Sequence, residues 1–261
     1  MKLDDVKKLH QKKYRTQFGY YIVEGEHLIL ELVKAAKLEK DNAAGAVYPL
    51  KASQLYVTEE YQEWANQLNS GFKILTVSKK QMVQLSDTKT PQGILAAVPL
   101  PSKALTSNSN SAAAVPEKVQ RCIYLHEVQD PGNLGTILRT LAWFGNFRLL
   151  LSPNSVDPFN SKVVRSSMGA IFHVPMELDV ELADLESRFD RFAYLDMNGA
   201  AVNSPEFSDF PCYLFGNEAR GVPREALTGF NATAFTIPGS GAIESLNLAS
   251  AVNMSAYQLS L

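Results

Sequence analysis

The chain has 261 residues, of which 46% are hydrophobic, and its formal net charge is -2 at pH 7. This composition predicts a globular protein with a sizeable core, in one large domain or two modest ones. It excludes a generally basic protein, so any nucleic-acid partner must be bound by local patches. The sequence has no apolar run of membrane-spanning length, and its two cysteines, Cys122 and Cys212, have no metal-ligand spacing. We expect a cytoplasmic protein with free thiols, no metal and no membrane partner.

A basic helix is predicted at the start of the chain. Residues 1–15 place Leu3, Val6 and Leu9 on one side of a helix and basic side chains on the other. The segment has six Lys or Arg against two Asp, a net charge of about four, which suits contacts with several phosphates. The alternative is that this basic face is simply exposed to solvent and binds no phosphate. The candidate phosphate-binding residues are Lys8, Lys12, Lys13 and Arg15.

Apolar runs typical of strands then alternate with helical patterns as far as residue 98. We expect strands at 20–23, 55–58, 74–77 and 93–98, and helices at 26–36 and 59–68. The residues that follow are rich in Ser, Asn and Ala and poor in large apolar side chains, which is typical of a linker. We therefore predict a domain at 1–100, a flexible linker at 101–118 and a second domain at 119–261.

The second domain alternates strands and helices more regularly. Strands are expected at 122–125, 147–151, 170–174, 192–195, 212–215 and 234–237. The helical patterns between them indicate an α/β fold with a mostly parallel sheet covered by helices. The last predicted helix spans 245–259, with Ser245 as its N-cap.

Three clusters in the second domain carry residues suited to chemistry. The first, at 126–139, has Asp-Pro-Gly followed by an asparagine and an arginine. The second, at 214–221, is a loop with an acid between glycines, and the third, at 237–247, runs from Ile-Pro to Glu-Ser-Leu-Asn. Apolar strands that stop at glycine-rich loops bring bare backbone groups to one sheet edge. The pattern predicts a small-ligand site at that edge.

The three motifs, in this order, resemble those of the SpoU (TrmH-like) family of RNA ribose 2′-O-methyltransferases, over most of residues 121–261. The first domain is similar to the ribosomal-protein-like substrate-binding domain of many members, at residues 9–15, 23–25 and 90–93. The resemblance implies a carboxy-terminal trefoil knot and a homodimer formed through the second domain. It also implies RNA as the substrate, with ribosomal RNA favoured over transfer RNA.

The methyl donor implied by the resemblance is S-adenosyl-L-methionine. The positions carried over to its site are Leu214, Gly216, Asn217, Ile237, Pro238, Ser245 and Leu246. Apolar walls and a closely approaching backbone suit an adenine ring. For Gly216 or Ser245 considered alone, the alternative to a donor site is an ordinary turn at the end of a strand or an ordinary helix cap. Many members have methionine after Ile-Pro where this chain has Gly239, so we predict weaker donor binding than methionine would give.

The catalytic residues implied by the resemblance are Asn133, Arg139, Glu218, Ser245 and Asn247. An arginine stays protonated under nearly all conditions, so we expect Arg139 to orient the substrate and stabilise charge on the 2′-oxygen rather than remove a proton. Asn133 either caps its helix or orients Arg139, and Glu218 either holds Asn133, favours the donor's charge or anchors its loop. Further candidates for RNA binding are Lys162, Arg165 and Arg220.

The main hypothesis is therefore S-adenosylmethionine-dependent methyl transfer to a ribose 2′-hydroxyl of structured RNA. The alternative is a catalytically silent RNA-binding or ribosome-assembly protein on the same fold. A third interpretation, a nucleotide-dependent oxidoreductase, is disfavoured because this chain has no G-x-G-x-x-G turn after the first predicted strand of either domain. Trp64 and Trp143 are interpreted as core or interface anchors, since no aromatic series suited to stacking successive bases is evident.

Overall fold

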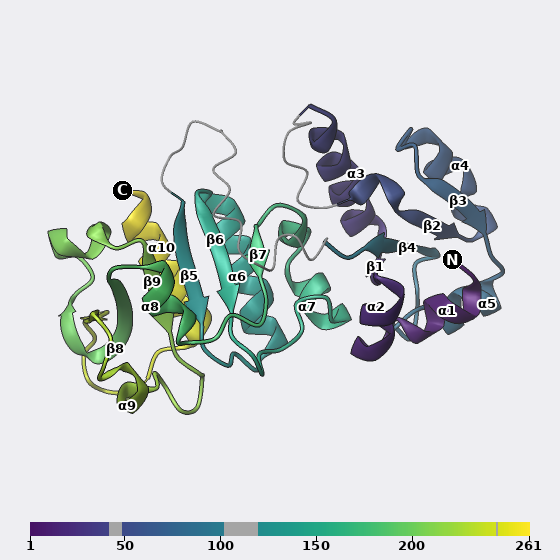
Figure 1. The fold of residues 1–261 in the computed structure, drawn as a ribbon. Coiled ribbons are helices and arrows are strands. Elements are labelled where there is room, and N and C mark those ends of the chain that lie inside the picture. The colour runs from purple at the N-terminus through teal and green to yellow at the C-terminus, as the bar shows by residue number, and fades with distance from the viewer. Residues whose placement is uncertain (42–48, 102–119, 244) are drawn as a thin grey trace. The chain divides into compact units, whose positions relative to one another are not determined.

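A computed structural model of the chain describes residues 1–41, 49–101, 120–243 and 245–261 (Figure 1). Contacts between Cα atoms divide it into a first unit, Met1–Lys103 with Asp157–His173, and a second unit, Ala104–Val156 with Val174–Leu261. This division differs from the sequence-based one, which assigned 157–173 to the second domain. The predicted linker at 101–118 lies, apart from Pro101, outside the described residues.

The first unit contains a four-stranded sheet in the order β1-β4-β2-β3. Strand β4 pairs antiparallel with β1 and β2, and β2 pairs parallel with β3. The strands are β1 (Tyr20–Glu24), β2 (Gln54–Val57), β3 (Lys73–Thr76) and β4 (Ile94–Pro99). Each lies within one residue of its predicted position at both ends, because short apolar runs bounded by turns define these strands locally.

Helices of the first unit cover this sheet. They are α1 (Leu3–Lys8), α2 (Lys12–Phe18), α3 (Glu26–Asp41), α4 (Glu59–Gln67), α5 (Lys79–Leu85) and α7 (Ser161–Ser166), with short 3-10 helices η1 (Leu50–Ala52) and η3 (Ala170–Phe172). Val6 and Leu9 from the α1 segment and Met82 and Leu85 from α5 pack in one core cluster with Ile22 of β1.

The single helix predicted for residues 1–15 is wrong, because the chain forms α1 and α2 with a break between them. The guanidinium of Arg15 explains the break. Its Nη1 donates hydrogen bonds to the carbonyl oxygens of Leu9 (2.8 Å) and His10 (2.9 Å). These carbonyls therefore have partners without a continuous helix.

The second unit contains a six-stranded, all-parallel sheet in the order β10-β8-β9-β5-β6-β7. Its strands are β5 (Arg121–Leu125), β6 (Phe147–Leu151), β7 (Met176–Glu177), β8 (Phe192–Ala201), β9 (Cys212–Phe215) and β10 (Ala232–Thr236). Side chains of its central strands, among them Tyr124, Cys212 and Leu214, form a fully buried core. The predicted α/β fold with a parallel sheet is confirmed.

One predicted strand, 170–174, is wrong. Residues Ala170–Phe172 form the 3-10 helix η3, and the two-residue strand β7 follows it. Met168 (φ 51°) and Gly169 (φ 92°) are both left-handed, so the chain turns immediately before this apolar run. An apolar run of this length does not by itself distinguish a strand from a buried helical segment.

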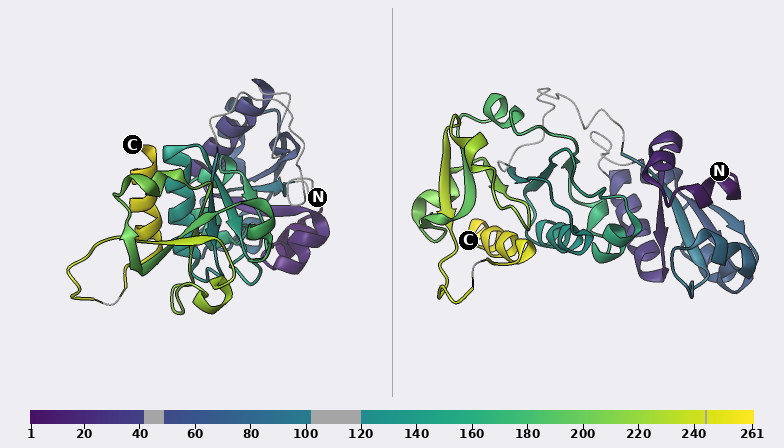
Figure 2. Two further views of the ribbon diagram at one scale, coloured as in Figure 1. Left: turned by 60° about the vertical axis from the view of Figure 1, so that its left-hand side comes forward. Right: turned by 90° about the horizontal axis from the view of Figure 1, so that it is seen from below.

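The helices of the second unit are α6 (Pro131–Phe144), α8 (Asp184–Arg188), α9 (Arg224–Leu227) and α10 (Leu248–Ser260), with the 3-10 helix η4 (Pro205–Asp209). Helices α6 and α10 pack against each other on one face of the sheet, and α8 lies on the opposite face (Figure 2). The last helix begins at Leu248 and not at the predicted Ser245. Among the described helices, none combines the length and apolar character needed to cross a bilayer.

The two cysteines lie side by side on neighbouring strands. Cys122 of β5 is the register partner of Cys212 of β9, and both are free thiols. Burial raises the pKa of Cys122 to about 11 and that of Cys212 well above its ordinary value. Both thiols are therefore protonated and poorly nucleophilic near neutral pH.

Candidate active site

The candidate site lies at one edge of the parallel sheet of the second unit. Strand β9 lies beside β5, and β8 lies between β9 and β10. Because these strands are parallel, their carboxyl ends face the same edge. The segments that leave this edge are 126–130 after β5, 216–221 after β9, and 237–243 after β10. Residues 237–243 run outward from the sheet (Figure 2).

Glu218 joins the second motif to the first. Its carboxylate accepts hydrogen bonds from the backbone N–H groups of Gln129 (3.1 Å) and Asp130 (3.1 Å) and from the side-chain amide of Asn133 (3.3 Å). Burial acts to raise the pKa of Glu218, but hydrogen bonds outweigh it, first from its own backbone and then from these three groups, so the pKa lies below its ordinary value. Glu218 is therefore an ionised anchor between the two loops at neutral pH.

Asn133 joins all three motifs. Its Nδ2 donates to Glu218, and its Oδ1 accepts a hydrogen bond from Nδ2 of Asn247 at 3.0 Å. The alternative that Asn133 caps its own helix is not what the structure shows. Asp130 is the N-cap of α6, and its Oδ1 accepts the backbone N–H of Asn133 at 2.7 Å. An Asp before Pro at a helix start is a signal that could have identified this cap from sequence.

Asn247 has a second role as the N-cap of α10. Its Oδ1 accepts the backbone N–H of Ser250 at 3.2 Å, while its Nδ2 reaches Asn133. The predicted cap, Ser245, is wrong: this serine is exposed and lies before the helix. The first turns of α6 and α10 are thus joined through two asparagine side chains.

The loop 217–221 is shaped by the side chain of Asn217, which is only 7% exposed. Its Oδ1 accepts the backbone N–H groups of Ala219 (2.9 Å) and Arg220 (3.0 Å), and its Nδ2 donates to the carbonyl oxygen of Glu127 (2.6 Å). Asn217, assigned to the donor site by resemblance, therefore uses its side chain within the protein. Its backbone N–H and carbonyl oxygen are also paired with those of Gly221, so Asn217 is suited to hold the loop in shape.

Glu127 is a residue of this edge that the sequence did not single out. It has φ 51°, in the left-handed region that costs non-glycine residues free energy, and its carboxylate pairs with the guanidinium of Arg220. The pair links the segment after β5 to the segment after β9. No sequence signal predicted it, because Glu-Val-Gln is an ordinary loop sequence.

The donor-site candidates divide into a backbone group and an exposed loop group. Leu214 is fully buried, and a Cβ added at Gly216 would lie 2.1 Å from the carbonyl carbon of Gly221, so only glycine fits there. Beyond β10, Ile237 is half-buried, Pro238 is exposed and Leu246 is 44% exposed. Aliphatic side chains and a bare glycine backbone are both features that suit an adenine nucleoside.

Arg139 lies apart from this hydrogen-bonded network. It is exposed on α6, and among the described residues no hydrogen bond or ion pair engages its guanidinium. The structure therefore connects Asn133, Glu218 and Asn247 directly, but does not connect Arg139 or Ser245 to them. A free, exposed guanidinium is available for an anionic ligand.

The basic candidates in the first unit separate into exposed and buried side chains. Lys8, Lys12 and Lys13 are exposed. Arg15 is 5% exposed, and beyond its bonds to two carbonyls it forms an ion pair with Asp157 at 2.6 Å. We leave Arg15 out of any RNA-binding surface, because its guanidinium is already engaged inside the protein.

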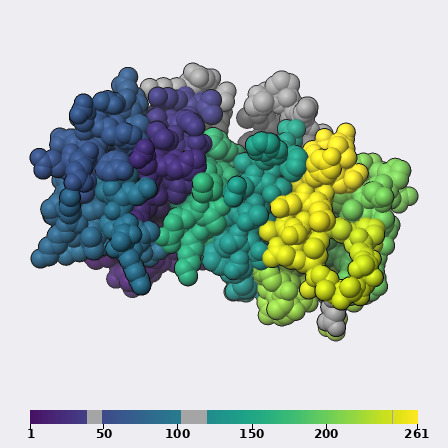
Figure 3. Space-filling model, turned by 180° about the vertical axis from the view of Figure 1, so that it is seen from behind, coloured from purple at the N-terminus to yellow at the C-terminus, as the bar shows by residue number. Residues whose placement is uncertain are grey.

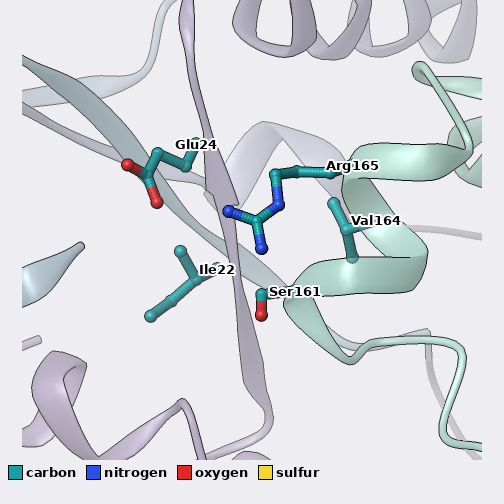
Figure 4. Close-up of a pocket in the computed structure, with 5 residues that line it drawn as sticks. All are labelled: Ile22, Glu24, Ser161, Val164 and Arg165. Carbon is teal, nitrogen blue, oxygen red and sulfur yellow. The ribbon is translucent and has the colours of Figure 1, made fainter. Parts of the chain in front are cut away.

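Helix α7 carries the candidates Lys162 and Arg165. Arg165 Nη2 donates to Asp87 Oδ2 at 3.0 Å, and Ser161 donates to the same oxygen at 2.8 Å. The bond from Ser161 is the largest influence holding the pKa of Asp87 below its ordinary value. Figure 4 shows Arg165 and Ser161 facing Glu24 and Ile22 of β1 around a small pocket. This pocket lies wholly within the first unit and contains none of the donor-site candidates.

The described residues contain no group of three or more His, Cys, Asp or Glu side chains that could hold a metal ion. His126 follows β5 at the site edge, and burial is the main cause of its lowered pKa. A histidine of this kind is neutral at physiological pH and belongs to the packing of the strand end.

Comparison with known proteins identifies the family. Residues 120–257 match the SpoU rRNA Methylase family, and residues 2–96 match the MRM3-like substrate binding domain. The chain therefore belongs to the SpoU rRNA methylase family, with an MRM3-like substrate-binding domain ahead of the methylase domain.

Similar proteins cover nearly the whole chain. The 23S rRNA (guanosine(2553)-2′-O)-methyltransferase RlmP of Bacillus subtilis is 28% identical over 262 residues, covering 99% of this chain and 95% of RlmP. A putative RNA methyltransferase of the TrmH family from Porphyromonas gingivalis matches with TM-score 0.74 and 27% identity, covering 98% of this chain and 96% of its own. An AdoMet-bound rRNA methyltransferase from Sinorhizobium meliloti has the same fold, with TM-score 0.75 and 24% identity over 98% of this chain and 93% of its own.

Proposed function

We propose that this protein transfers a methyl group from S-adenosyl-L-methionine to a ribose 2′-hydroxyl of ribosomal RNA. The observation that carries the proposal is the hydrogen-bonded chain Glu218–Asn133–Asn247 at the carboxyl edge of a parallel sheet, in a member of the SpoU rRNA methylase family. Ribosomal RNA is favoured by the names of the family and of RlmP. We also infer a cytoplasmic location, which two free thiols support.

We assign the donor to the space between the loops 216–221 and 237–247. The backbone at Leu214 and Gly216 and the side chains of Ile237, Pro238 and Leu246 would hold it, with Ser245 at the same loop. The donor supplies an electrophilic methyl group on a positively charged sulfonium. The ionised carboxylate of Glu218 favours positive charge nearby, and its bonds to Asn133 fix the loop geometry. The AdoMet-bound protein with the same fold supports this assignment.

Arg139 is proposed to orient the RNA. Its exposed guanidinium can bind a phosphate and the 2′-oxygen together, which fixes the attack geometry and stabilises negative charge as it develops on that oxygen. Asn133 and Asn247 hold the first turn of the helix that carries Arg139, so they act as positioning residues. The transfer forms the O–CH3 bond, breaks the S–CH3 bond and releases S-adenosylhomocysteine, and the hydroxyl proton passes to the solvent.

The RNA is proposed to contact exposed cations of both units. In the first unit these are Lys8, Lys12 and Lys13, and near the donor loops Arg220 is exposed beside Glu127. Lys162 and Arg165 are retained as secondary candidates, since Arg165 remains 38% exposed while it pairs with Asp87. The match of residues 2–96 to a substrate-binding domain supports RNA binding by the first unit.

We further propose a homodimer formed through α6 and α10. Trp143 of α6 is 85% exposed, and Met254, Tyr257 and Leu261 at the end of α10 are 48%, 56% and 82% exposed. Figure 3 shows the carboxy-terminal residues, in yellow, at the surface. An exposed apolar patch of this kind is typical of a protein interface. Arg139 lies one turn from Trp143 on α6, so a dimer formed here would bring Arg139 to the interface.

Incubation with methyl-labelled donor and ribosomal RNA tests the proposed function. Wild-type protein should leave label in alkali-resistant dinucleotides, because a 2′-O-methyl group blocks alkaline cleavage. Arg139→Ala should reduce the rate by about 10²- to 10³-fold and leave donor binding unchanged. Arg191→Ala, which removes an exposed arginine over the Phe210 ring, is the control.

Label confined to bases would contradict the proposed reaction. Equal rates for Arg139→Ala and wild type would contradict the role of Arg139. RNA binding without any methyl transfer would favour the catalytically silent alternative. Mapping 2′-O-methyl sites in ribosomal RNA from cells that lack the protein would identify the nucleotide.

A further inference from the structure

An exposed cluster of lysines and stacked aromatic rings lies on α1 and α2 of the first unit. The rings of Tyr14 and Phe18, one helical turn apart, are stacked with centroids 5.9 Å apart and planes inclined by 17°. The Nζ of Lys8 lies 5.8 Å from the Tyr14 centroid and 6.0 Å from that of Phe18. The Nζ of Lys13 lies 5.8 Å from the Tyr14 centroid. We call Lys8, Lys13, Tyr14 and Phe18 the aromatic–lysine cluster.

Contacts on the buried side of α2 hold this cluster in place. Phe18 packs against the core that contains Val6 and Leu9, whereas Tyr14 is half-buried and is not part of that core. Arg15, between the two rings in sequence, pins α2 through the carbonyl oxygens before the helix and through Asp157. The buried side of α2 therefore fixes the Tyr14 ring at the surface, and little ordering is needed when a ligand binds.

The chemistry of the cluster matches one unpaired nucleotide. A nucleobase offers a flat face to an aromatic ring, and its phosphates offer negative charge to ammonium groups. The ammonium of an exposed lysine sits at the end of a flexible chain, so a base can take its place over the ring while the ammonium moves to a neighbouring phosphate. Paired bases in an RNA helix are stacked on one another and do not offer such a face.

We propose that Tyr14 stacks on an unpaired base of the RNA substrate, supported by Phe18, while Lys8 and Lys13 bind the phosphates beside that base. The inference rests on the proposed RNA-directed function and adds the kind of RNA that the first unit recognises, namely a single-stranded or looped segment. It also gives buried Arg15 a structural role, to position α2.

The test uses the full chain and a single-stranded RNA about 12 nucleotides long that carries 2-aminopurine. Binding is followed by fluorescence anisotropy, and stacking by quenching of the 2-aminopurine. Tyr14→Ala should weaken binding about tenfold and abolish quenching, whereas Tyr14→Phe should retain both. Lys13→Gln should reduce the slope of log K against log salt by about 0.7, and Tyr14→Ala should leave that slope unchanged. The same RNA annealed to its complement should bind less tightly and without quenching.

Unchanged binding by Tyr14→Ala would overturn the inference. Equal loss in Tyr14→Phe would also overturn it, because the hydroxyl rather than the ring would then matter. Polyglutamate that competes as well as polyuridine would show that the cluster serves an acidic protein instead. Circular dichroism and thermal melting of each variant show whether the fold is kept.

Methyl transfer by the same preparations separates this inference from the proposed function. Wild-type methylation of ribosomal RNA combined with unchanged RNA binding by Tyr14→Ala would defeat only the stacking role. Loss of quenching in Tyr14→Ala, combined with no methyl transfer by wild type, would defeat only the catalytic proposal.

Discussion

Asn133 illustrates how one side chain can connect loops that are distant in the sequence. An asparagine amide both donates and accepts, and here the two ends bind different partners, Glu218 and Asn247. An aspartate at this position could not donate to Glu218 and would repel it. The residue type is therefore fixed by the two contacts together, and not by the helix start on which it lies.

The depressed pKa of Glu218 predicts a pH dependence of stability. Its carboxylate is ionised in the folded protein at a pH where an ordinary glutamate in the unfolded chain is protonated. Its contribution to the free energy of unfolding is therefore fully present above about pH 5 and is lost as the pH falls through the lowered folded pKa. Glu218→Gln should be less stable than wild type at pH 7, with a difference that shrinks towards pH 3.

Urea unfolding of both proteins between these pH values measures this difference. Glu186→Gln, which changes an exposed glutamate of α8, controls for the loss of a surface charge. A difference that stays constant over the whole range would show that the carboxylate is not the source.

Gly239 predicts an effect on donor affinity. A Cβ added there meets no atom within 4 Å, and its φ is not in the left-handed region, so a larger side chain can be accommodated. Gly239→Met adds an apolar wall to the proposed donor site and should tighten binding by about 1 kcal/mol, or roughly fivefold. Calorimetric titration with S-adenosylmethionine measures the change.

Gly241→Met is the matched control for this substitution. It lies in the same loop, also without close neighbours, but has φ 76°, so a side chain there is strained. No gain in affinity is expected from it. Equal affinities for Gly239→Met and wild type would remove the argument that position 239 lines the donor site.

At the scale of elements, the start of α10 combines helix capping with site geometry. The helical spacing predicts Ser245 as the cap, although Asn247 is also of a residue type favoured at the N-cap. The structure selects Asn247, whose Oδ1 accepts the N–H of Ser250 while the other end of the amide reaches α6. Local propensity does not discriminate between these two residues, but the contact with Asn133 does.

Two substitutions of Asn247 separate the roles. Asn247→Ala should lower the free energy of unfolding by about 1 kcal/mol and reduce methyl transfer, because both the cap and the contact are lost. Asn247→Asp retains an acceptor for the cap, favoured by the helix dipole, but cannot donate to Asn133. It should keep stability and lose activity.

Urea unfolding and initial rates of methyl transfer measure the two effects. Ser245→Ala serves as the control for capping, and its stability should equal that of wild type. Full activity in Asn247→Asp would show that its bond to Asn133 is dispensable.

At the scale of the whole molecule, the proposed homodimer makes a prediction about oligomeric state. Trp143 is 85% exposed on α6 next to an apolar end of α10, and a charge at this position would be buried in the interface. Trp143→Glu should therefore be monomeric where wild type is dimeric, and its methyl transfer should fall because Arg139 lies one turn away. Sedimentation or light scattering after gel filtration measures the mass.

Met197→Glu is the control for the dimer. Met197 is 66% exposed on β8, a strand that carries none of the residues of the proposed interface, so a charge there should leave the mass unchanged. A monomeric wild type, or a dimer that survives in Trp143→Glu, would contradict this interface. The trefoil knot implied by the family resemblance stays a prediction.

The sequence alone indicated the four strands of the first unit, the parallel α/β class of the second unit and the loops that form the candidate site. These features depend on local patterns: apolar runs define the strands, and parallel strands necessarily end at one edge. Only the tertiary structure decided that Arg15 is buried, that the first helix is broken, and that Asn133 and Asn247 are joined at the candidate site. The physical reason is that these outcomes depend on partners far along the chain, such as Asp157 for Arg15 and Asn247 for Asn133, and no local pattern encodes such pairs.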